Sequence, residues 1–147
     1  MKFGFIGNGN MGRAIICGIL DNSIMNAENI IVSDLDREGL EWIKSKYGVN
    51  TTVDNKITAQ QADVLFLCVK PQFLYSVIEE IRDFLNENSV VVSIAAGQSI
   101  EAITEAFGRK IKLVRIMPNT PALVGEGMSA IAFNENISAA EKQMILD

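Results

Sequence analysis

Short apolar runs alternate with amphipathic segments along most of the chain. Five nearly continuous apolar runs predict strands that are buried on both faces of a parallel sheet: Phe3–Ile6, Ile30–Val32, Val64–Val69, Val90–Ile94 and Leu113–Ile116. Between them, apolar residues recur at spacings of three and four, which predicts helices with one face in the core. Those faces are Met11, Ala14, Ile15, Gly18 and Ile19; Leu40, Ile43 and Tyr47; Phe73, Val77, Ile78, Ile81 and Leu85; and Ile100, Ile103 and Phe107. The alternation predicts an α/β fold of the doubly wound type.

The pattern changes after Ile116. Met117–Pro121 contains two prolines, which restrict the backbone, so we expect neither a continued strand nor a smooth helix entry there. Met128–Phe133 predicts one more strand, and Ser138–Glu141 is a capping box that opens a final helix. That helix stops at Asp147 after about two turns, too few to bury an apolar face, so we expect a longer parent protein. The expected fold is one domain over residues 1–147, with about six mostly parallel strands and helices on both faces.

Composition narrows the possible functions. The net charge is −5 and no basic run is present, which argues against a nucleic-acid partner. The apolar runs are too short to span a membrane, and no signal-type segment opens the chain, so a cytoplasmic protein without a membrane partner is expected. Cys17 and Cys68 lack metal-ligand spacing and are expected to be reduced thiols. The chain has no histidine, which excludes histidine-based nucleophilic catalysis and histidine-ligated zinc within it. No metal site is expected.

The most informative motif follows the first predicted strand. Gly7, Gly9 and Gly12 form a Gly-x-Gly-x-x-Gly pattern that runs from a strand into an amphipathic helix. The first glycine permits a tight turn, the second lets a pyrophosphate approach the backbone, and the third lets the helix pack against the strand. The diphosphate would meet free N–H groups at the helix N-terminus. This context predicts a Rossmann-type dinucleotide site, against the alternative of a glycine-rich turn without a ligand.

Other suggestive loops follow the remaining strands, and the carboxyl ends of parallel strands share one edge of a sheet. Ser33 and Asp34 follow the second strand, and Asp34 lies where a carboxylate accepts hydrogen bonds from ribose hydroxyls. Asp34 would favour NAD, whereas Arg37 could meet the 2′-phosphate of NADP. The structural alternative for Asp34 is a charge that favours a helix N-terminus beside Asp36.

Three further loops complete this predicted edge. Lys70 either lies along the cofactor or is a solvated lysine before a helix that begins at Pro71, and Val69 and Pro71 would form rigid apolar walls. Ala95, Ala96 and Gly97 follow the next strand. Asn119 and Thr120 would bind a carboxamide or a carboxylate, or else cap their own turn. For Arg115, a charged strand end is favoured over an anion site.

Four stretches together resemble pyrroline-5-carboxylate reductase, in its N-terminal dinucleotide-binding domain. The resemblance covers essentially the whole chain, and the Met-Pro-Asn-Thr-Pro loop is its most specific part. The stretches are residues 4–12, GFIGNGNMG; 62–71, ADVLFLCVKP; 91–97, VVSIAAG; and 115–124, RIMPNTPALV.

The resemblance implies reduction of 1-pyrroline-5-carboxylate, a cyclic imine carboxylate, to L-proline with NAD(P)H. It implies that Asn55 contacts the adenosine end, that Asn119 and its loop lie near the nicotinamide, and that no catalytic residue can be named in this chain. The diphosphate would be held by Ile6, Gly7, Asn8, Gly9, Asn10 and Met11, and the cofactor cleft would be lined by Cys68, Val69, Lys70, Pro71, Ala95 and Ala96.

Two departures from the family pattern matter. Many NADP-using relatives carry Asn-Arg or serine-containing loops where this chain has Asp34 and Leu35, which favours NAD here. The family's C-terminal helical domain, which builds its homo-oligomer and most of its substrate pocket, is absent from this chain, so we expect cofactor binding with little or no turnover. Two alternatives stay open: another NAD(P) oxidoreductase of the same fold, such as a β-hydroxyacid dehydrogenase, and a non-catalytic NAD(P) sensor.

Overall fold

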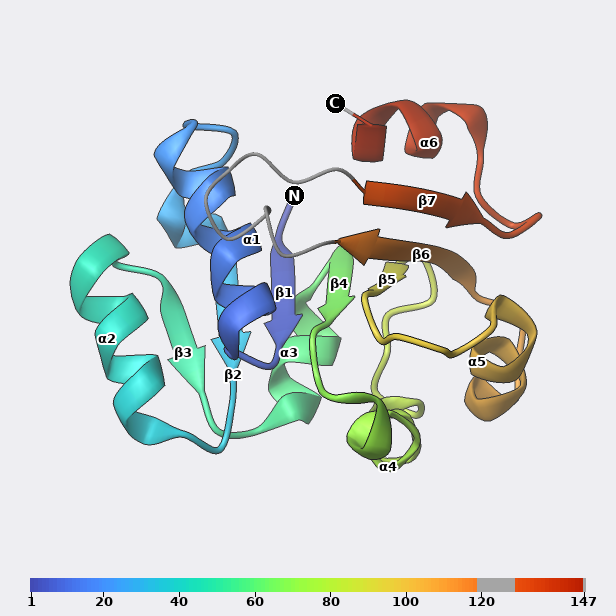
Figure 1. Cartoon of the computed structure of the whole chain (residues 1–147), viewed down its shortest axis with the longest axis horizontal. Coiled ribbons are helices and arrows are strands. Elements are labelled where there is room, and N and C mark those ends of the chain that lie inside the picture. The colour runs from blue at the N-terminus through green and yellow to red at the C-terminus, as the bar shows by residue number, and fades with distance from the viewer. Residues whose placement is uncertain (119–128, 147) are drawn as a thin grey trace.

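A seven-stranded sheet organises the computed structural model, which describes residues 1–118 and 129–146 (Figure 1). The strand order is β3-β2-β1-β4-β5-β6-β7, and every neighbouring pair is parallel except β6 and β7. The strands are β1 Phe3–Ile6, β2 Ile30–Ser33, β3 Asn50–Thr52, β4 Val64–Leu67, β5 Val90–Ser93, β6 Lys112–Pro118 and β7 Ser129–Phe133. The helices are α1 Asn10–Asp21, α2 Arg37–Tyr47, α3 Asn55–Gln61, α4 Pro71–Ile81, α5 Ile100–Phe107 and α6 Ala139–Leu146, with a 3₁₀ turn at Ala27–Asn29. The expected Rossmann-type α/β fold is confirmed.

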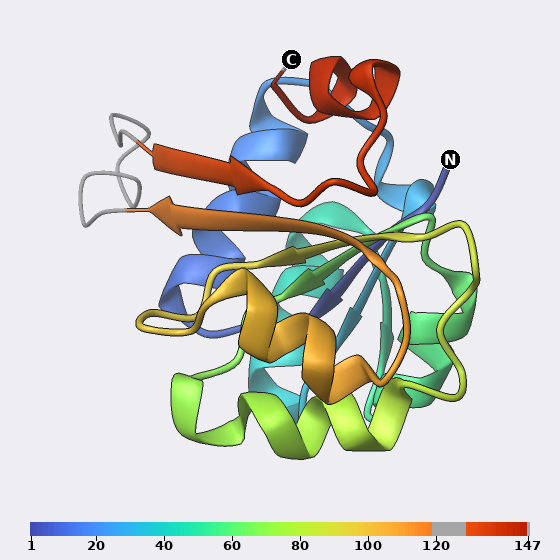
Figure 2. The same ribbon diagram turned by 90° about the vertical axis from the view of Figure 1, so that its right-hand side faces the viewer.

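The apolar runs form the central strands because both faces of the sheet are covered. Every residue of β2, β4 and β5 is buried. One core packs α3, α4 and α5 against one face, and a second core packs α1, α2 and α6 against the other. Figure 2 shows α4 and α5 on one side of the sheet and α1 and α6 on the other. A central strand with two buried faces needs apolar residues at successive positions, and the sequence shows that pattern.

The sequence predicted about six strands, and the sheet has seven. β3, a three-residue polar strand, pairs with β2 at the end of the sheet, and α3 follows it directly. Asp54 caps α3 by accepting a hydrogen bond from the Lys56 N–H. An edge strand this short and polar carries no apolar run, so hydropathy alone does not reveal it.

Two helix faces also differ from expectation. In α1 the buried side of the helix is Gly12 and Ile16, whereas the expected stripe from Met11 to Ile19 flanks it and is only half-buried. In α4 the expected core residue Phe73 is 54% exposed, while Leu74 is fully buried in its place. In α1 the apolar face is rotated by about one residue, because Gly12 must face the sheet. In α4 only the first position changes, and Val77, Ile78 and Ile81 are buried as predicted.

The last two strands form an antiparallel ribbon at one end of the sheet. We expected this strand to end at Ile116. β6 instead continues through Met117 to Pro118, because its pairing with β7 extends to Pro118 opposite Ser129. A proline at the end of a strand removes no ladder hydrogen bond that the strand requires. Residues 119–121 of the proline-rich motif lie outside the described part of the chain.

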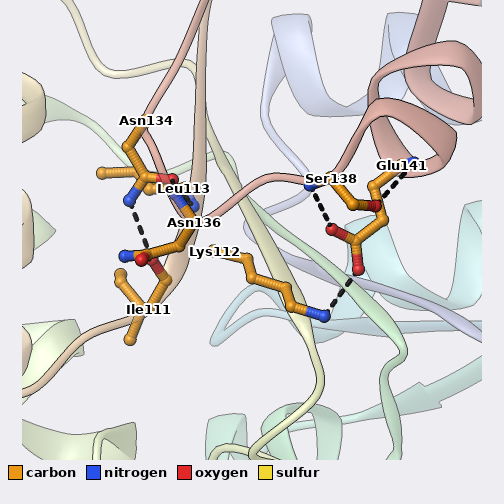
Figure 3. Close-up of polar contacts among 7 residues, drawn as sticks. All are labelled: Ile111, Lys112, Leu113, Asn134, Asn136, Ser138 and Glu141. Atoms are coloured by element: carbon orange, nitrogen blue, oxygen red, sulfur yellow. Dashed lines mark hydrogen bonds and ion pairs between the residues drawn. The ribbon is translucent and has the colours of Figure 1, made fainter.

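A polar cluster joins this ribbon to α6 (Figure 3). The Asn134 side chain accepts a hydrogen bond from the Leu113 N–H at 3.1 Å and donates to the Ile111 carbonyl at 2.8 Å. The predicted capping box is confirmed, since Ser138 and Glu141 exchange hydrogen bonds of 2.9 and 3.2 Å. Within residues 1–118 and 129–146, no helix is long and apolar enough to cross a membrane.

Candidate functional site

The carboxyl ends of five strands lie side by side. Ile6 is in register with Ser33 of β2 and with Leu67 of β4. Ser33 is in turn in register with Thr52 of β3, and Leu67 with Ser93 of β5. The loops that follow β1, β2, β4 and β5 therefore leave the sheet along one edge, as the sequence predicted. This edge is the place where open α/β sheets bind ligands.

The glycine-rich loop between β1 and α1 is packed tightly at two of its three glycines. Gly7 has φ +105°, and a Cβ there would lie 2.6 Å from the Cys68 carbonyl oxygen. A Cβ on Gly12 would lie 2.7 Å from the Gly7 carbonyl oxygen. The Gly7 N–H donates to the Ser33 carbonyl at 2.8 Å. The loop is therefore fixed against both neighbouring strand ends, and only glycine fits at its two tight positions.

Gly9, the middle glycine, is different because it faces open space. A Cβ built on it meets no atom within 4 Å of the described structure. Gly9 is the N-cap of α1, where no side chain provides a capping hydrogen bond, and no acidic residue lies in the first turn. Uncapped N–H groups at a helix N-terminus with open space beside them suit a phosphate group. The loop therefore fits the diphosphate of a dinucleotide.

Asp34, directly after β2, is hydrogen-bonded to the glycine-rich loop. Its Oδ2 accepts from the Asn8 N–H at 2.6 Å, and its Oδ1 accepts from the Asp36 N–H at 3.0 Å. The N-cap of α2 is Asp36, which accepts from the Gly39 N–H at 3.2 Å. Asp34 is therefore not the N-cap itself, but it lies beside the N-terminus of α2, so the alternative of a charge that favours this helix end stays open. The Asp34 carboxylate lies next to the loop that would hold a diphosphate.

Asn55 lies at the same edge although no hydropathy pattern indicated it. The buried Ser33 hydroxyl donates to Asn55 Oδ1 at 2.8 Å, and the Asn55 amide donates to Glu80 at 3.3 Å. The contact depends on α3, which was not predicted, so only the family resemblance pointed to Asn55. Its place beside Ser33 is consistent with the adenosine side of the cleft.

The loop between β4 and α4 forms the next part of the edge. Cys68 donates its N–H to the Ile6 carbonyl at 2.8 Å, and burial raises the pKa of its thiol to about 12. Lys70 is exposed and is the N-cap position of α4, which begins at Pro71. Within the described residues its ammonium makes no ion pair, so both predicted roles for Lys70 stay open.

The far end of the edge is formed by β5 and β6. Ala95 is buried and Ala96 is exposed, in the loop that turns at Gly97 with φ +73°. Arg115 donates to the Met117 sulfur at 3.3 Å, and its buried Nε has no partner in the part of the chain that is described. The predicted Asn119 and Thr120 lie outside the described residues.

One hollow in the described surface lies away from this edge. A hollow of about 590 Å³ lies on the outer side of α2, lined by Glu38, Glu41, Trp42, Ser45 and Lys46. All of its lining comes from one helix and none from the strand ends. No cluster of three or more potential metal ligands occurs in residues 1–118 and 129–146.

Sequence reasoning did not assign a role to Asp36 and Gly39, which the structure brings into this site. The signal was present in the sequence, because aspartate is a preferred N-cap residue and Asp36 precedes an amphipathic stretch. The functional consequence was not visible, since it depends on the Asn8 side chain of a distant loop.

Comparison with known proteins agrees with this geometry. Residues 2–97 match the family model described as "NADP oxidoreductase coenzyme F420-dependent". A pyrroline-5-carboxylate reductase of Corynebacterium melassecola is 41% identical over 145 residues, which are 97% of this chain and 53% of that protein. The chain thus spans about half the length of the curated relatives it matches.

Two solved structures are also similar. The pyrroline-5-carboxylate reductase of Coxiella burnetii has a TM-score of 0.94 and 36% identity, over 98% of this chain and 53% of that one. The Plasmodium falciparum enzyme, solved with NADP bound, has a TM-score of 0.87 and 31% identity, over 99% of this chain and 52% of that one.

Proposed function

Because the chain belongs to the NADP oxidoreductase coenzyme F420-dependent family, we propose that it is the dinucleotide-binding part of a pyrroline-5-carboxylate reductase. The observation that carries the proposal is the glycine-rich loop, which is closed at Gly7 and Gly12 and open at Gly9, on the edge where five strand ends meet. The similarity to pyrroline-5-carboxylate reductases over nearly the whole chain supports the choice of reaction.

In this proposal each loop of the edge binds one part of NAD(P)H. The backbone around Gly9, Asn10 and Met11 binds the diphosphate, and Asp34 with Asn55 binds the adenosine ribose. The buried Ser33 hydroxyl holds the Asn55 side chain in place. The wall of the cleft beside the nicotinamide half is formed by Cys68, Val69, Lys70, Pro71, Ala95 and Ala96. When bound, reduced NAD(P)H supplies the hydride that the imine carbon accepts. The protein contributes orientation, which brings reacting atoms to attack distance.

The fixed carboxylate of Asp34 leads us to propose a preference for NADH. A carboxylate accepts hydrogen bonds from the 2′- and 3′-hydroxyls of NADH, whereas it repels the 2′-phosphate of NADPH. Arg37, the first residue of α2, is the group that would oppose this preference.

The substrate and the assembly belong to the same proposal. The substrate is a small cyclic imine carboxylate, and the complete enzyme is a cytoplasmic homo-oligomer whose subunit contacts come from sequence beyond these 147 residues. The support is the length of the relatives, of which this chain matches about half.

The direct test is calorimetric titration of the 147-residue protein with NADH and with NADPH at one ionic strength. We expect saturable binding of at least one dinucleotide, with NADH bound more tightly. Tighter binding of NADPH would overturn the assigned preference and would favour Arg37 as the group that contacts the ribose. Failure to bind either dinucleotide would contradict the proposed site itself.

A further inference from the structure

Asn8 joins the glycine-rich loop to α2 through a closed ring of four hydrogen bonds. Its N–H donates to Asp34 Oδ2 at 2.6 Å, and Asp34 Oδ1 accepts from the Asp36 N–H at 3.0 Å. Asp36 Oδ1 accepts from the Gly39 N–H at 3.2 Å, and the Gly39 carbonyl accepts from Asn8 Nδ2 at 2.9 Å. The ring therefore returns to Asn8, and it connects the glycine-rich loop to residues 34–39, two segments that are far apart in the sequence.

The ring restrains the Asp34 carboxylate on both of its oxygens. A carboxylate that accepts from one backbone donor can still rotate about that bond, whereas one held by donors from two loops has a fixed position. The Asp34 carboxylate then cannot rotate away from a ligand that carries a phosphate group next to it. Discrimination by charge is strongest when the charge is fixed, because no reorganisation relieves the repulsion.

The side chain of Asn8 contributes little to stability for its own sake. It is 4% exposed, and its Oδ1 is buried without a partner among the described residues. One amide hydrogen bond stabilises the fold only modestly, and a buried acceptor without a partner opposes that gain. These contributions roughly cancel, so the clear effect of the side chain is to fix geometry.

We propose that Asn8 is a positioning residue for coenzyme choice, which holds Asp34 through the ring so that NADH is preferred over NADPH. This inference rests on the proposed function. Asn8 itself need not touch the ribose, since it acts through the carboxylate of Asp34.

The test is a double-mutant cycle of Asn8→Ala and Asp34→Asn, read as the ratio of the Kd values for NADPH and NADH. We expect a ratio of about ten or more in the unmodified chain, a ratio near one in Asp34→Asn, and at least about a threefold fall in Asn8→Ala. The double variant should match Asp34→Asn, because Asn8 acts only through Asp34. A merely structural role would weaken both dinucleotides equally and leave the ratio unchanged.

A second readout needs no cofactor. The amide proton of residue 8, which donates to a carboxylate at 2.6 Å, should move upfield in NMR spectra of both single variants. Gly39→Ala perturbs the ring at Asp36, because a Cβ on residue 39 would lie 2.7 Å from Asp36 Oδ2. It should lower the Kd ratio in the same direction.

The matched control is Asn22→Ala, which removes an asparagine side chain that donates to the Gly18 carbonyl at 2.7 Å at the other end of α1. Its Kd ratio should equal that of the unmodified chain. Normal binding by Asn8→Ala with an unchanged ratio would overturn the role of Asn8 alone. Absence of binding by the unmodified chain would overturn the proposed function and this inference with it.

Discussion

At the scale of single residues, the three glycines of the loop differ in why they must be glycine. Gly7 has a positive φ and touches the Cys68 backbone, whereas Gly9 has ordinary extended angles and faces open space. Gly7 is thus required by the fold, and Gly9 is required only by a ligand that approaches the backbone.

We therefore expect Gly7→Ala and Gly9→Ala to separate stability from binding. Gly7→Ala should lower the free energy of unfolding by about 2–3 kcal/mol or more, because a positive φ and a backbone clash both oppose the new Cβ. Gly9→Ala should leave the Tm within about 2 °C and still weaken dinucleotide binding about tenfold, since its Cβ occupies ligand space. Thermal unfolding and calorimetry measure the two effects. Full binding by Gly9→Ala would contradict the diphosphate position.

Cys68 is the second residue whose surroundings predict behaviour. Burial raises its pKa to about 12, so the thiol stays protonated at pH 8 and is a poor nucleophile. Iodoacetamide should modify it about a hundredfold more slowly in the folded protein than in urea, as followed by mass spectrometry. This thiol favours the folded state below the ordinary cysteine pKa, and that contribution is lost as the pH rises toward 12. Equal modification rates in the two conditions would show that Cys68 is not protected.

At the scale of elements, α6 is held by side chains as well as by packing. Lys112 of β6 and Glu141 of α6 form an ion pair of 2.6 Å, and Glu141 also closes the capping box with Ser138. Burial opposes ionisation of Glu141, but hydrogen bonds from Lys112 and Ser138 and the nearby ammonium outweigh it and lower the pKa of the carboxyl. The attachment of α6 therefore depends on one ionised side chain in addition to the packing of Met144 and Ile145 against the core.

Glu141→Gln should destabilise the protein by about 1 kcal/mol at pH 7. Because the pKa is lowered on folding, the contribution of Glu141 is present above the unfolded pKa of about 4.3 and is lost as the pH falls through the folded value. The difference between variant and parent should therefore narrow below about pH 4, as measured by urea unfolding. Glu135→Gln, at an exposed position before α6, is the control and should have no comparable effect. A difference that persists unchanged at low pH would show that the ionised form is not responsible.

At the scale of the whole molecule, the sheet edge provides the binding surface but no identified proton donor. Most of the rate of hydride transfer comes from holding substrate and nicotinamide at attack distance, and the matched relatives are about twice as long as this chain. In the proposed function, the role of the described residues is to hold the dinucleotide.

We therefore expect the 147-residue chain to bind NAD(P)H yet to reduce 1-pyrroline-5-carboxylate at least about a hundredfold more slowly than a full-length relative. The decrease of NADH absorbance with added substrate measures the rate. A rate equal to that of the full-length enzyme would show that the chain carries the whole active site.

The central strands, the glycine-rich loop and the capping box at Ser138 could all be predicted from the amino-acid sequence. Each of these depends on residues that are adjacent or three to four positions apart, so local pattern and helix or strand geometry are sufficient to predict it. The shared edge of the loops also followed, because parallel strands place their carboxyl ends together.

Four features became visible only in the folded chain: the polar strand β3, the exposed position of Phe73, the contact between Ser33 and Asn55, and the ring that closes through Asn8. These features bring together segments that are far apart in the chain. Their energies depend on distances of a few ångströms between side chains, and the spacing of apolar residues along the sequence does not specify those distances. The sequence thus sets which chemical groups reach the sheet edge, and the packing of helices against the sheet decides which of them meet.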